Sequence, residues 1–157
     1  MFIARSHIDL HNIRQSVDRI GNVSDNVVHF GPIKLGLEAV LEFVPFVGEI
    51  YSMIAGALLV IEGVRARVPG TTLMSVTFLI GVRTVMGAGN LIPIPGVGVL
   101  SELAAAAFRA HKISADMIAK AMDETLYIEG HKGDPEYADV LASVRAGKEK
   151  RRVVYLG

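Results

Sequence analysis

The sequence predicts an all-α protein whose middle, residues 35–110, forms two apolar helical hairpins that are each broken by a Pro/Gly turn. Three observations predict this class: an apolar composition, amphipathic helical patterns on both sides of the middle, and a Pro/Gly pattern that occurs twice within it. The 157 residues are 51% hydrophobic and 20% charged, with a mean hydropathy of +0.42. An average soluble domain carries about 25% charged residues. The surplus of apolar side chains indicates a protein that lies in or on a membrane.

Charge and cysteine content exclude several functional classes. The 16 basic and 16 acidic residues give a formal net charge of zero, so no long-range attraction to nucleic acid is expected. The absence of cysteine excludes disulfides, thiolate zinc sites and thiol nucleophiles. The start of the chain lacks the apolar run of a signal peptide, which favours a cytoplasmic N-terminus.

Residues 1–34 form the predicted N-terminal amphipathic segment. Apolar residues at positions 8, 13, 17 and 20 recur among polar ones at helical spacing, so a helix is expected within residues 7–29. Gly21 weakens this helix, and Gly31 with Pro32 ends it. Such a helix would lie on a surface or face a partner.

The first apolar unit, residues 35–64, is interrupted by Pro45 and Gly48. Proline lacks a backbone donor and disfavours a helical residue before it, so two helical arms are expected, 35–44 and 49–64. The second unit contains Pro93, Pro95 and Gly96 as its break. Because residues 45–48 and 93–96 both read P-x-x-G, we interpret the two units as a weak internal duplication.

Residues 111–157 are predicted to return to ordinary amphipathic helix. The pattern places Ile113, Met117, Ile118 and Met122 on one face of a helix over 110–129. A last short helix is expected over 135–146, because an aspartate followed by proline favours a helix start. The basic tail that follows is expected to be disordered or to lie on a surface.

The arms of the apolar units are too short for conventional membrane spans. A span needs about 20 apolar residues to cross roughly 30 Å of hydrocarbon, whereas arms 35–44 and 49–64 would rise about 15 and 24 Å. We therefore predict re-entrant hairpins that cover each other's broken backbone. Full crossing by tilted arms 49–64 and 71–89 is one alternative, and a compact soluble helical core is another. Small residues would allow close helix packing: Ala55, Gly56, Ala57, Gly81, Gly87 and 104–107.

Basic residues occur before, between and after the two units. Arg65 and Arg67 separate the units, and further arginines and lysines flank them on both sides. If basic segments stay cytoplasmic, each unit enters and returns on one side of the membrane, with both termini in the cytoplasm.

Four sequence pieces resemble domain-of-unknown-function family 4112, which comprises bacterial and archaeal proteins. They are residues 36–37 (GL), 45–49 (PFVGE), 62–69 (EGVRARVP) and 93–97 (PIPGV), and the resemblance covers about residues 30–115. It implies two apolar units with P-x-x-G-D turns and a basic linker, association with the bacterial inner membrane, and no established activity. Glu49 replaces the usual Asp and Val97 stands at the second acidic position, so a function that needs both acids is not expected.

Glu49, Arg83 and Glu102 are candidate intramembrane charges. Ionisable groups at that depth are rare and usually paired, so Glu49 and Arg83 are expected either to form a structural pair or to line a proton or ion path. Glu49 also follows the Pro/Gly break, where a helix would begin and its dipole would favour an acid. We favour a structural role.

No pattern indicates catalysis, a cofactor or a metal. His7 and His11 share a helical spacing but have no further ligands. The segment G-x-G-x-x-S over 96–101 lacks the third glycine of a dinucleotide loop. We therefore expect neither an enzyme nor a bound cofactor.

The leading functional hypothesis is a non-enzymatic membrane protein that serves as an accessory, scaffold or assembly subunit. Its expected partners are membrane lipids and other membrane subunits or a second copy of itself, without nucleic acid. Four basic residues of the tail are expected to contact anionic lipid or a partner: Lys148, Lys150, Arg151 and Arg152. One alternative is a small channel or transporter component with a Glu/Arg site, and a second is a soluble helical binding protein.

Overall fold

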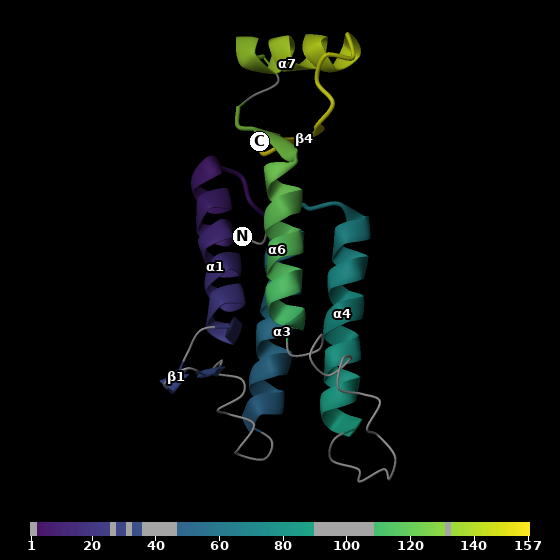
Figure 1. Ribbon diagram of the computed structural model, residues 1–157. Coiled ribbons are helices and arrows are strands. Elements are labelled where there is room, and N and C mark those ends of the chain that lie inside the picture. Colours follow the sequence, from purple (N-terminus) through teal and green to yellow (C-terminus); the bar gives the residue numbers. More distant parts are fainter. Residues whose placement is uncertain (1–2, 26–27, 31–32, 36–46, 90–108, 131–132) are drawn as a thin grey trace.

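A computed structural model describes residues 3–25, 28–30, 33–35, 47–89, 109–130 and 133–157. Side chains are described for residues 3–23, 50–85, 109–130 and 133–157. The helices in this part of the chain are α1 (His7–Asp25), α3 (Val47–Arg65), α4 (Gly70–Gly89), α6 (Ala110–Asp123) and α7 (Pro135–Arg145) (Figure 1). The strands are β1 (Val28–Phe30), β2 (Ile33–Leu35), β3 (Thr125–Ile128) and β4 (Arg152–Tyr155).

Four of the helices form an up-and-down bundle. Helices α1, α3, α4 and α6 lie side by side and alternate in direction along the chain (Figure 1). Helix α6 packs against α1 and α4, while α3 packs against α4 and α1. The α3–α4 pair therefore forms one side of the bundle and the α1–α6 pair forms the opposite side.

The core draws side chains from every helix of the bundle. Ile13 of α1, Leu59 of α3, Val76 of α4 and Ile118 of α6 are each no more than 1% exposed. Burial of these apolar side chains supplies the main driving force for bundle formation. The division into residues 1–34, 35–110 and 111–157 stays a prediction, although each of these ranges contributes to the shared core.

The expected small-residue packing occurs at Gly56 but not at Gly81. A Cβ added at Gly56 would lie 2.5 Å from Cγ2 of Ile80 on α4, so the absent side chain allows α3 and α4 to approach closely. A Cβ at Gly81 would have open space around it. The two glycines therefore differ, because one lies in the helix interface and the other on the outer face.

The basic linker predicted between the units forms the reversal between α3 and α4. Arg67 adopts a left-handed conformation with φ 52°. The N–H of Val68 donates to the carbonyl of Gly63 over 3.1 Å, and the hydroxyl of Tyr127 donates to the carbonyl of Ala66 over 2.7 Å. These bonds fix the turn, so α3 and α4 form a helical hairpin across the linker.

The predicted inner arms 49–64 and 71–89 agree with α3 and α4. Gly48 and Glu49 lie in the first turn of α3, which begins just after Pro45 as a Pro/Gly break requires. Leu35, expected to begin a helical arm, ends β2 instead. The rest of arm 35–44, the whole second break and the helix predicted to precede residue 110 lie outside the described residues.

The length and apolar character of the helices fall short of a membrane span. Within the residues that the structure describes, no helix is both long and apolar enough to cross a bilayer. The alternative of full crossing by tilted arms 49–64 and 71–89 as transmembrane helices is therefore not supported in that part of the chain.

The all-α prediction is confirmed in outline, but the C-terminal segment was predicted wrongly in two places. The helix expected over 110–129 ends at Asp123, and residues 125–128 form β3. The tail expected to be disordered or to lie on a surface forms β4, which pairs with β3 in parallel. Both strands are rich in β-branched and aromatic residues. Helix α7, which confirms the helix predicted over 135–146, connects them.

The predicted N-terminal amphipathic helix is confirmed as α1, although it ends at Asp25 and residues 28–30, expected to be helical, form β1. Its first turn carries a reciprocal cap. A carboxylate oxygen of Asp9 accepts hydrogen bonds from the backbone N–H groups of Arg5 and Ser6 at 2.9 and 3.2 Å. In return, the Asp9 N–H donates to the Ser6 hydroxyl at 3.1 Å. This arrangement resembles a capping box, which satisfies donors that the helix itself leaves unpaired.

We expect the Asp9→Asn variant to show a weaker dependence of stability on acid pH than the native chain. The bond from the Arg5 backbone, aided by Ser6, lowers the pKa of Asp9 from its ordinary value of 3.8. The folded state therefore gains stability above pH 3.8 and loses it as the pH falls through 3.8 toward the lower folded value. Melting temperatures between pH 6 and 2.5 measure this effect, with Asp139→Asn as the control. Parallel curves for the native and Asp9→Asn proteins would contradict it.

Candidate functional site

In the α3–α4 hairpin, apolar side chains face outward and the charged side chain of α4 faces inward, whereas surface helices usually expose their charged side chains. Between Ile50 and Ile61 the sequence has no charged residue, and between Gly70 and Val85 its one charged residue is Arg83. Arg83 is only 7% exposed. The hairpin thus turns its charge inward and presents apolar side chains outward.

The outer face of the hairpin carries eight large apolar side chains, which we call the apolar face. They are Ile50, Met53, Ile54, Leu58 and Ile61 of α3 with Met74, Phe78 and Val85 of α4. Phe78 is 71% exposed and Met74 is 76% exposed. Single exposed apolar residues are ordinary, but a contiguous group of this kind marks a surface that contacts a partner or lipid.

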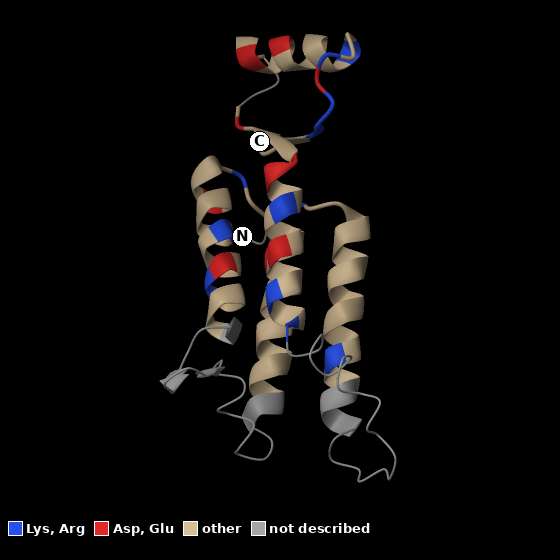
Figure 2. Ribbon diagram, in the orientation of Figure 1, with Lys and Arg blue, Asp and Glu red and all other residues tan. Residues whose placement is uncertain are grey.

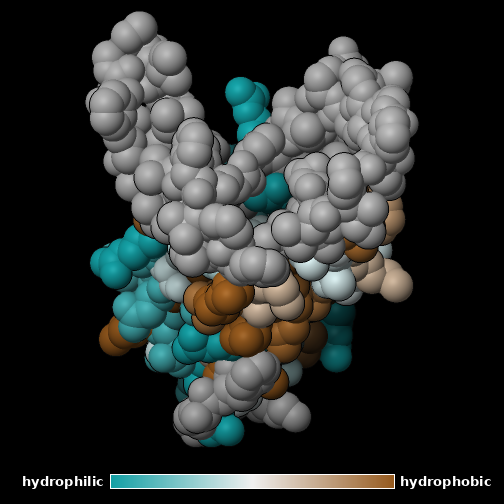
Figure 3. Space-filling model, turned by 90° about the horizontal axis from the view of Figure 1, so that it is seen from below, coloured by the Kyte–Doolittle hydropathy of each residue, from teal (hydrophilic) through white to brown (hydrophobic). Residues whose placement is uncertain are grey.

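Shallow grooves cross the apolar face. One groove of about 200 Å³ runs between the two helices, and its lining includes Met53, Gly56, Ile80 and Thr84. A second groove of about 370 Å³ lies over Phe78, Gly81, Val82 and Val85 on α4. Figure 3 shows the lower end of the bundle, where hydrophobic atoms are exposed next to one another between the residues drawn in grey. The grooves are open and apolar, which suits flexible hydrocarbon better than a compact polar ligand.

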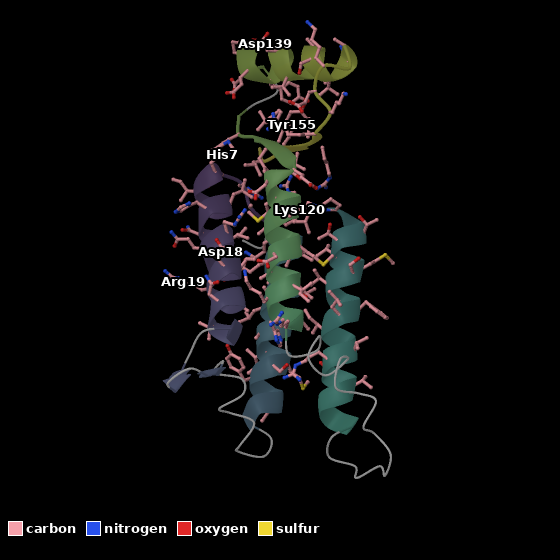
Figure 4. All side chains as sticks on the ribbon, in the orientation of Figure 1. His7, Asp18, Arg19, Lys120, Asp139 and Tyr155 are labelled. Atoms are coloured by element: carbon pink, nitrogen blue, oxygen red, sulfur yellow. The ribbon has the colours of Figure 1, made fainter. Side chains whose placement is uncertain are left out.

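Charged side chains gather on the opposite side of the bundle. Helices α1 and α6 carry acidic and basic residues along their length, whereas α4 carries few (Figure 2). Asp18 and Arg19 of α1 and Lys120 of α6 are exposed (Figure 4). Arg14 joins the two helices by a 2.6 Å ion pair with Asp123. The bundle as a whole is therefore amphipathic, with a charged α1–α6 face and an apolar α3–α4 face.

A polar group lies inside the bundle at the end where α3 and α6 begin. Nε2 of His111 on α6 lies 2.9 Å from the Ser52 carbonyl oxygen and 3.5 Å from the Ser52 hydroxyl on α3. His111 and Ser114 are both 0% exposed, and Ser52 is 7% exposed. The hydrogen bonds between His111 and Ser52 offset the cost of burying these two polar groups, whereas the buried Ser114 hydroxyl has no hydrogen-bond partner in the described part of the chain.

Arg83 lies near the level of this polar group along the bundle. Gly56 of α3 faces Ile80 of α4, and the two helices are antiparallel, so one turn further Arg83 reaches the level of Ser52 and Met53. Sequence reasoning singled out Arg83 but missed His111. The spacing of His111, Ser114 and Ile118 on one face of α6 was the signal that could have found it.

The other candidate charges are only partly placed. Glu49 lies in α3 one turn before Ser52, at the same end of the hairpin as Arg83. The structure does not describe its side chain, so the Glu49–Arg83 pair stays a prediction. Glu102 and the turn residues Pro45, Pro93, Pro95 and Gly96 lie outside the described residues. Within the described part of the chain, no group of three or more potential ligands among His, Asp and Glu could hold a metal ion.

Of the predicted basic contact residues, Arg152 lies beside the α3–α4 turn, whereas Lys148, Lys150 and Arg151 lie in the segment between α7 and β4. A guanidinium N–H of Arg152 donates to the carbonyl of Arg67, and Arg67 donates in turn to the carbonyl of Tyr155 at 2.6 Å. Arg151 pairs with Glu149 at 2.9 Å, and hydrogen bonds from Arg151 lower the pKa of Glu149 to about 2. We call the following set the basic collar: Arg65, Arg67, Lys148, Lys150, Arg151 and Arg152.

Comparison with known proteins gives one result. Neither the curated proteins nor the solved structures contain a match to this chain. The model of a family described as a domain of unknown function, DUF4112, matches residues 13–122, which span α3, α4 and most of α1 and α6. This range covers more than two thirds of the 157 residues and confirms the resemblance noted in the sequence. The chain therefore belongs to the DUF4112 family.

Proposed function

We propose that the protein is a non-enzymatic, membrane-associated accessory or assembly subunit that acts through its apolar face. The observation that carries this proposal is the eight exposed apolar side chains of the α3–α4 hairpin, with no exposed charge among them. In water such a surface is unfavourable, at roughly 25 cal/mol per Å² of apolar area. Contact with lipid or with the apolar surface of another membrane subunit removes that cost.

The polar interior supports a structural rather than a catalytic role. His111 and Ser114 are fully buried, so the group with Ser52 gives a substrate no access in the described part of the chain. The His111–Ser52 bonds join α6 to α3 and help to set how these helices pair. This reading agrees with the absence of a catalytic pattern in the sequence.

The arrangement of the chain supports an orientation at the cytoplasmic side of the bacterial inner membrane. The N–H of Ala4 donates to the carbonyl of Arg65 at 3.0 Å, and Tyr155 accepts a bond from Arg67. The described segments nearest both termini therefore lie at the end of the bundle that carries the basic collar. Basic segments favour the cytoplasmic side.

A small channel or transporter component is the second candidate. Buried Arg83, together with His111 at a similar level of the bundle, favours it because buried ionisable groups between helices often mark ion paths. Ion flux across vesicles that contain the purified protein distinguishes the two candidates. Flux would favour the channel, whereas an accessory subunit gives none.

We expect the native chain to remain in the membrane pellet after an alkaline carbonate wash, and Phe78→Glu to be released more than tenfold more readily. Losing the contact of one large apolar side chain is worth on the order of 2 kcal/mol, which corresponds to that factor. Ile8→Glu is the matched control, because Ile8 is 73% exposed on α1, close to the 71% of Phe78. Immunoblots of pellet and supernatant measure the ratio.

Two outcomes would contradict the proposal. If the native chain stays in the soluble fraction without detergent, a soluble helical binding protein becomes the better reading. If Phe78→Glu and Ile8→Glu behave alike, the apolar face does not carry the association. Sizing of the detergent-extracted native protein then shows whether other subunits or further copies accompany it.

A further inference from the structure

We propose that the apolar face docks in the plane of a single leaflet of an anionic bilayer, with the bundle axis parallel to the surface and the basic collar on the lipid headgroups. This inference rests on the proposed membrane association and names its partner and its geometry. The partner is defined by its chemistry: hydrocarbon beneath a layer of anionic phosphate headgroups.

The shape of the apolar face supports an in-plane orientation. From Ile50 to Ile61 and from Met74 to Val85, each helix extends about 16 Å at 1.5 Å per residue. Antiparallel helices that pack directly lie about 8–10 Å apart. The face is therefore a flat surface formed by two helices. An amphipathic surface of this kind buries its apolar side about 5–10 Å deep at the boundary of headgroups and acyl chains.

The opposite face of the bundle excludes an upright orientation. Exposed Asp18 and Arg19 on α1, and Asp116 and Lys120 on α6, run along the same length of the bundle as the apolar face. If the bundle stood upright in the hydrocarbon, these charges would be submerged with the apolar side chains, which is strongly unfavourable. If the bundle lies flat, the α1–α6 face remains in water.

The basic collar provides the charge complementarity for anionic headgroups. Arg65 pairs with Glu62 and Arg151 pairs with Glu149, at 2.9 Å in each case. The remaining members of the collar have no carboxylate partner within the described part of the chain: Arg67, Lys148, Lys150 and Arg152. Arg65 of the collar follows Ile61, the last residue of the apolar face on α3, by one turn, and Arg152 donates a hydrogen bond to the carbonyl of Arg67 just beyond it. Positive charge beside a buried apolar surface is the pattern that anionic leaflets bind.

The collar also argues against a second copy in parallel orientation as the occupant of the face. Two chains that paired through their apolar faces in a parallel orientation would bring two collars of the same sign together, which is unfavourable. Anionic lipid accommodates both features at once, because its hydrocarbon covers the apolar face and its phosphates neutralise the collar.

The first test measures depth with a single tryptophan, since the chain has none of its own. Phe78→Trp reports from the apolar face, and Ile8→Trp is the matched control on α1. The purified full-length variants are added to vesicles of phosphatidylcholine and phosphatidylglycerol whose acyl chains are brominated either near the headgroup or near the chain end. We expect stronger quenching of Phe78→Trp by the shallow bromines and no quenching of Ile8→Trp.

The second test measures the contribution of the collar to vesicle binding. Lys148→Gln/Lys150→Gln removes two exposed collar charges, and Arg19→Gln/Lys120→Gln removes two from the α1–α6 face. We expect the collar variant to bind anionic vesicles roughly 25-fold more weakly, at about fivefold for each charge, and the control pair to bind as the native chain does. Binding to phosphatidylcholine alone should not distinguish the two pairs.

The outcomes separate this inference from the proposed function. Stronger quenching by the deep bromines, or equal quenching of both tryptophans, overturns in-plane docking. Equal loss of binding in the two double variants overturns headgroup recognition by the collar. An unquenched Phe78→Trp in a chain that still pellets with native membranes overturns the lipid-docking inference and leaves a protein partner. The proposed function itself is overturned only if the chain also fails to pellet with native membranes.

Discussion

Replacing Ile118 with alanine is expected to lower the free energy of unfolding by about 2–5 kcal/mol. Ile118 is 0% exposed in the core between α1, α3, α4 and α6, and its Cδ1 lies 3.5 Å from the position of a Cβ at Gly63. Removal of three buried carbons leaves a cavity at a point where several helices meet and where none can move in without disturbing its other contacts. Urea denaturation in mild detergent, followed by circular dichroism, measures the loss.

The matched control for this variant is Ile113→Ala on the same helix. Ile113 was predicted to share the buried face of α6, yet it is 39% exposed. We expect its replacement to cost less than half as much, because the side chain already contacts solvent. Equal losses at the two positions would show that the bundle core is not centred where the structure places it.

Gly56→Val is expected to destabilise the protein by about 2–3 kcal/mol, because the new side chain overpacks the contact between α3 and α4. A Cβ at this position lies 2.5 Å from Cγ2 of Ile80, and the two further methyl groups of valine need more space still. Ile80 is β-branched and stiff, so relief requires the helices to separate. The change in melting temperature, followed by circular dichroism, measures the effect.

Gly81→Val is the control, since this glycine is also helical but has open space around the position of its Cβ. Glycine and valine have similarly modest helix propensities, so the stability should change by less than about 0.5 kcal/mol. A large loss at Gly81 would contradict the assignment of that position to the outer face. A small loss at Gly56 would contradict the close approach of α3 and α4.

The parts of the fold that the sequence predicted are those governed by local chemistry. Helix α3 begins at Val47, within the break predicted from Pro45 and Gly48, and the segment Asp134–Pro135 marks the start of α7. Local patterns were insufficient where a distant partner decided the outcome. Residues 125–128 continue the helical pattern of α6, but they pair with residues 152–155 as a parallel strand. No local signal records that partner, since a parallel pair needs a crossover between its strands.

For the candidate site too, the sequence could identify some residues but not others. Arg83 could be singled out because a lone charge in an apolar helix is conspicuous in any sequence. The pairing of His111 with Ser52 could not be recognised, since Ser52 lies 59 residues away and belongs to another helix. The apolar face had no sequence signature of its own, because α3 and α4 are apolar almost all round.

The sequence by itself determined that residues 49–64 and 71–89 are helical and apolar, and that a basic linker separates them. These properties follow from backbone chemistry and composition, which act over a few residues. Only the tertiary structure decided which apolar side chains became core and which became surface. Leu59 is buried and Leu58 is 43% exposed although they are adjacent and identical. The choice depends on which side of α3 meets α1, α4 and α6, and that is a property of the assembled bundle.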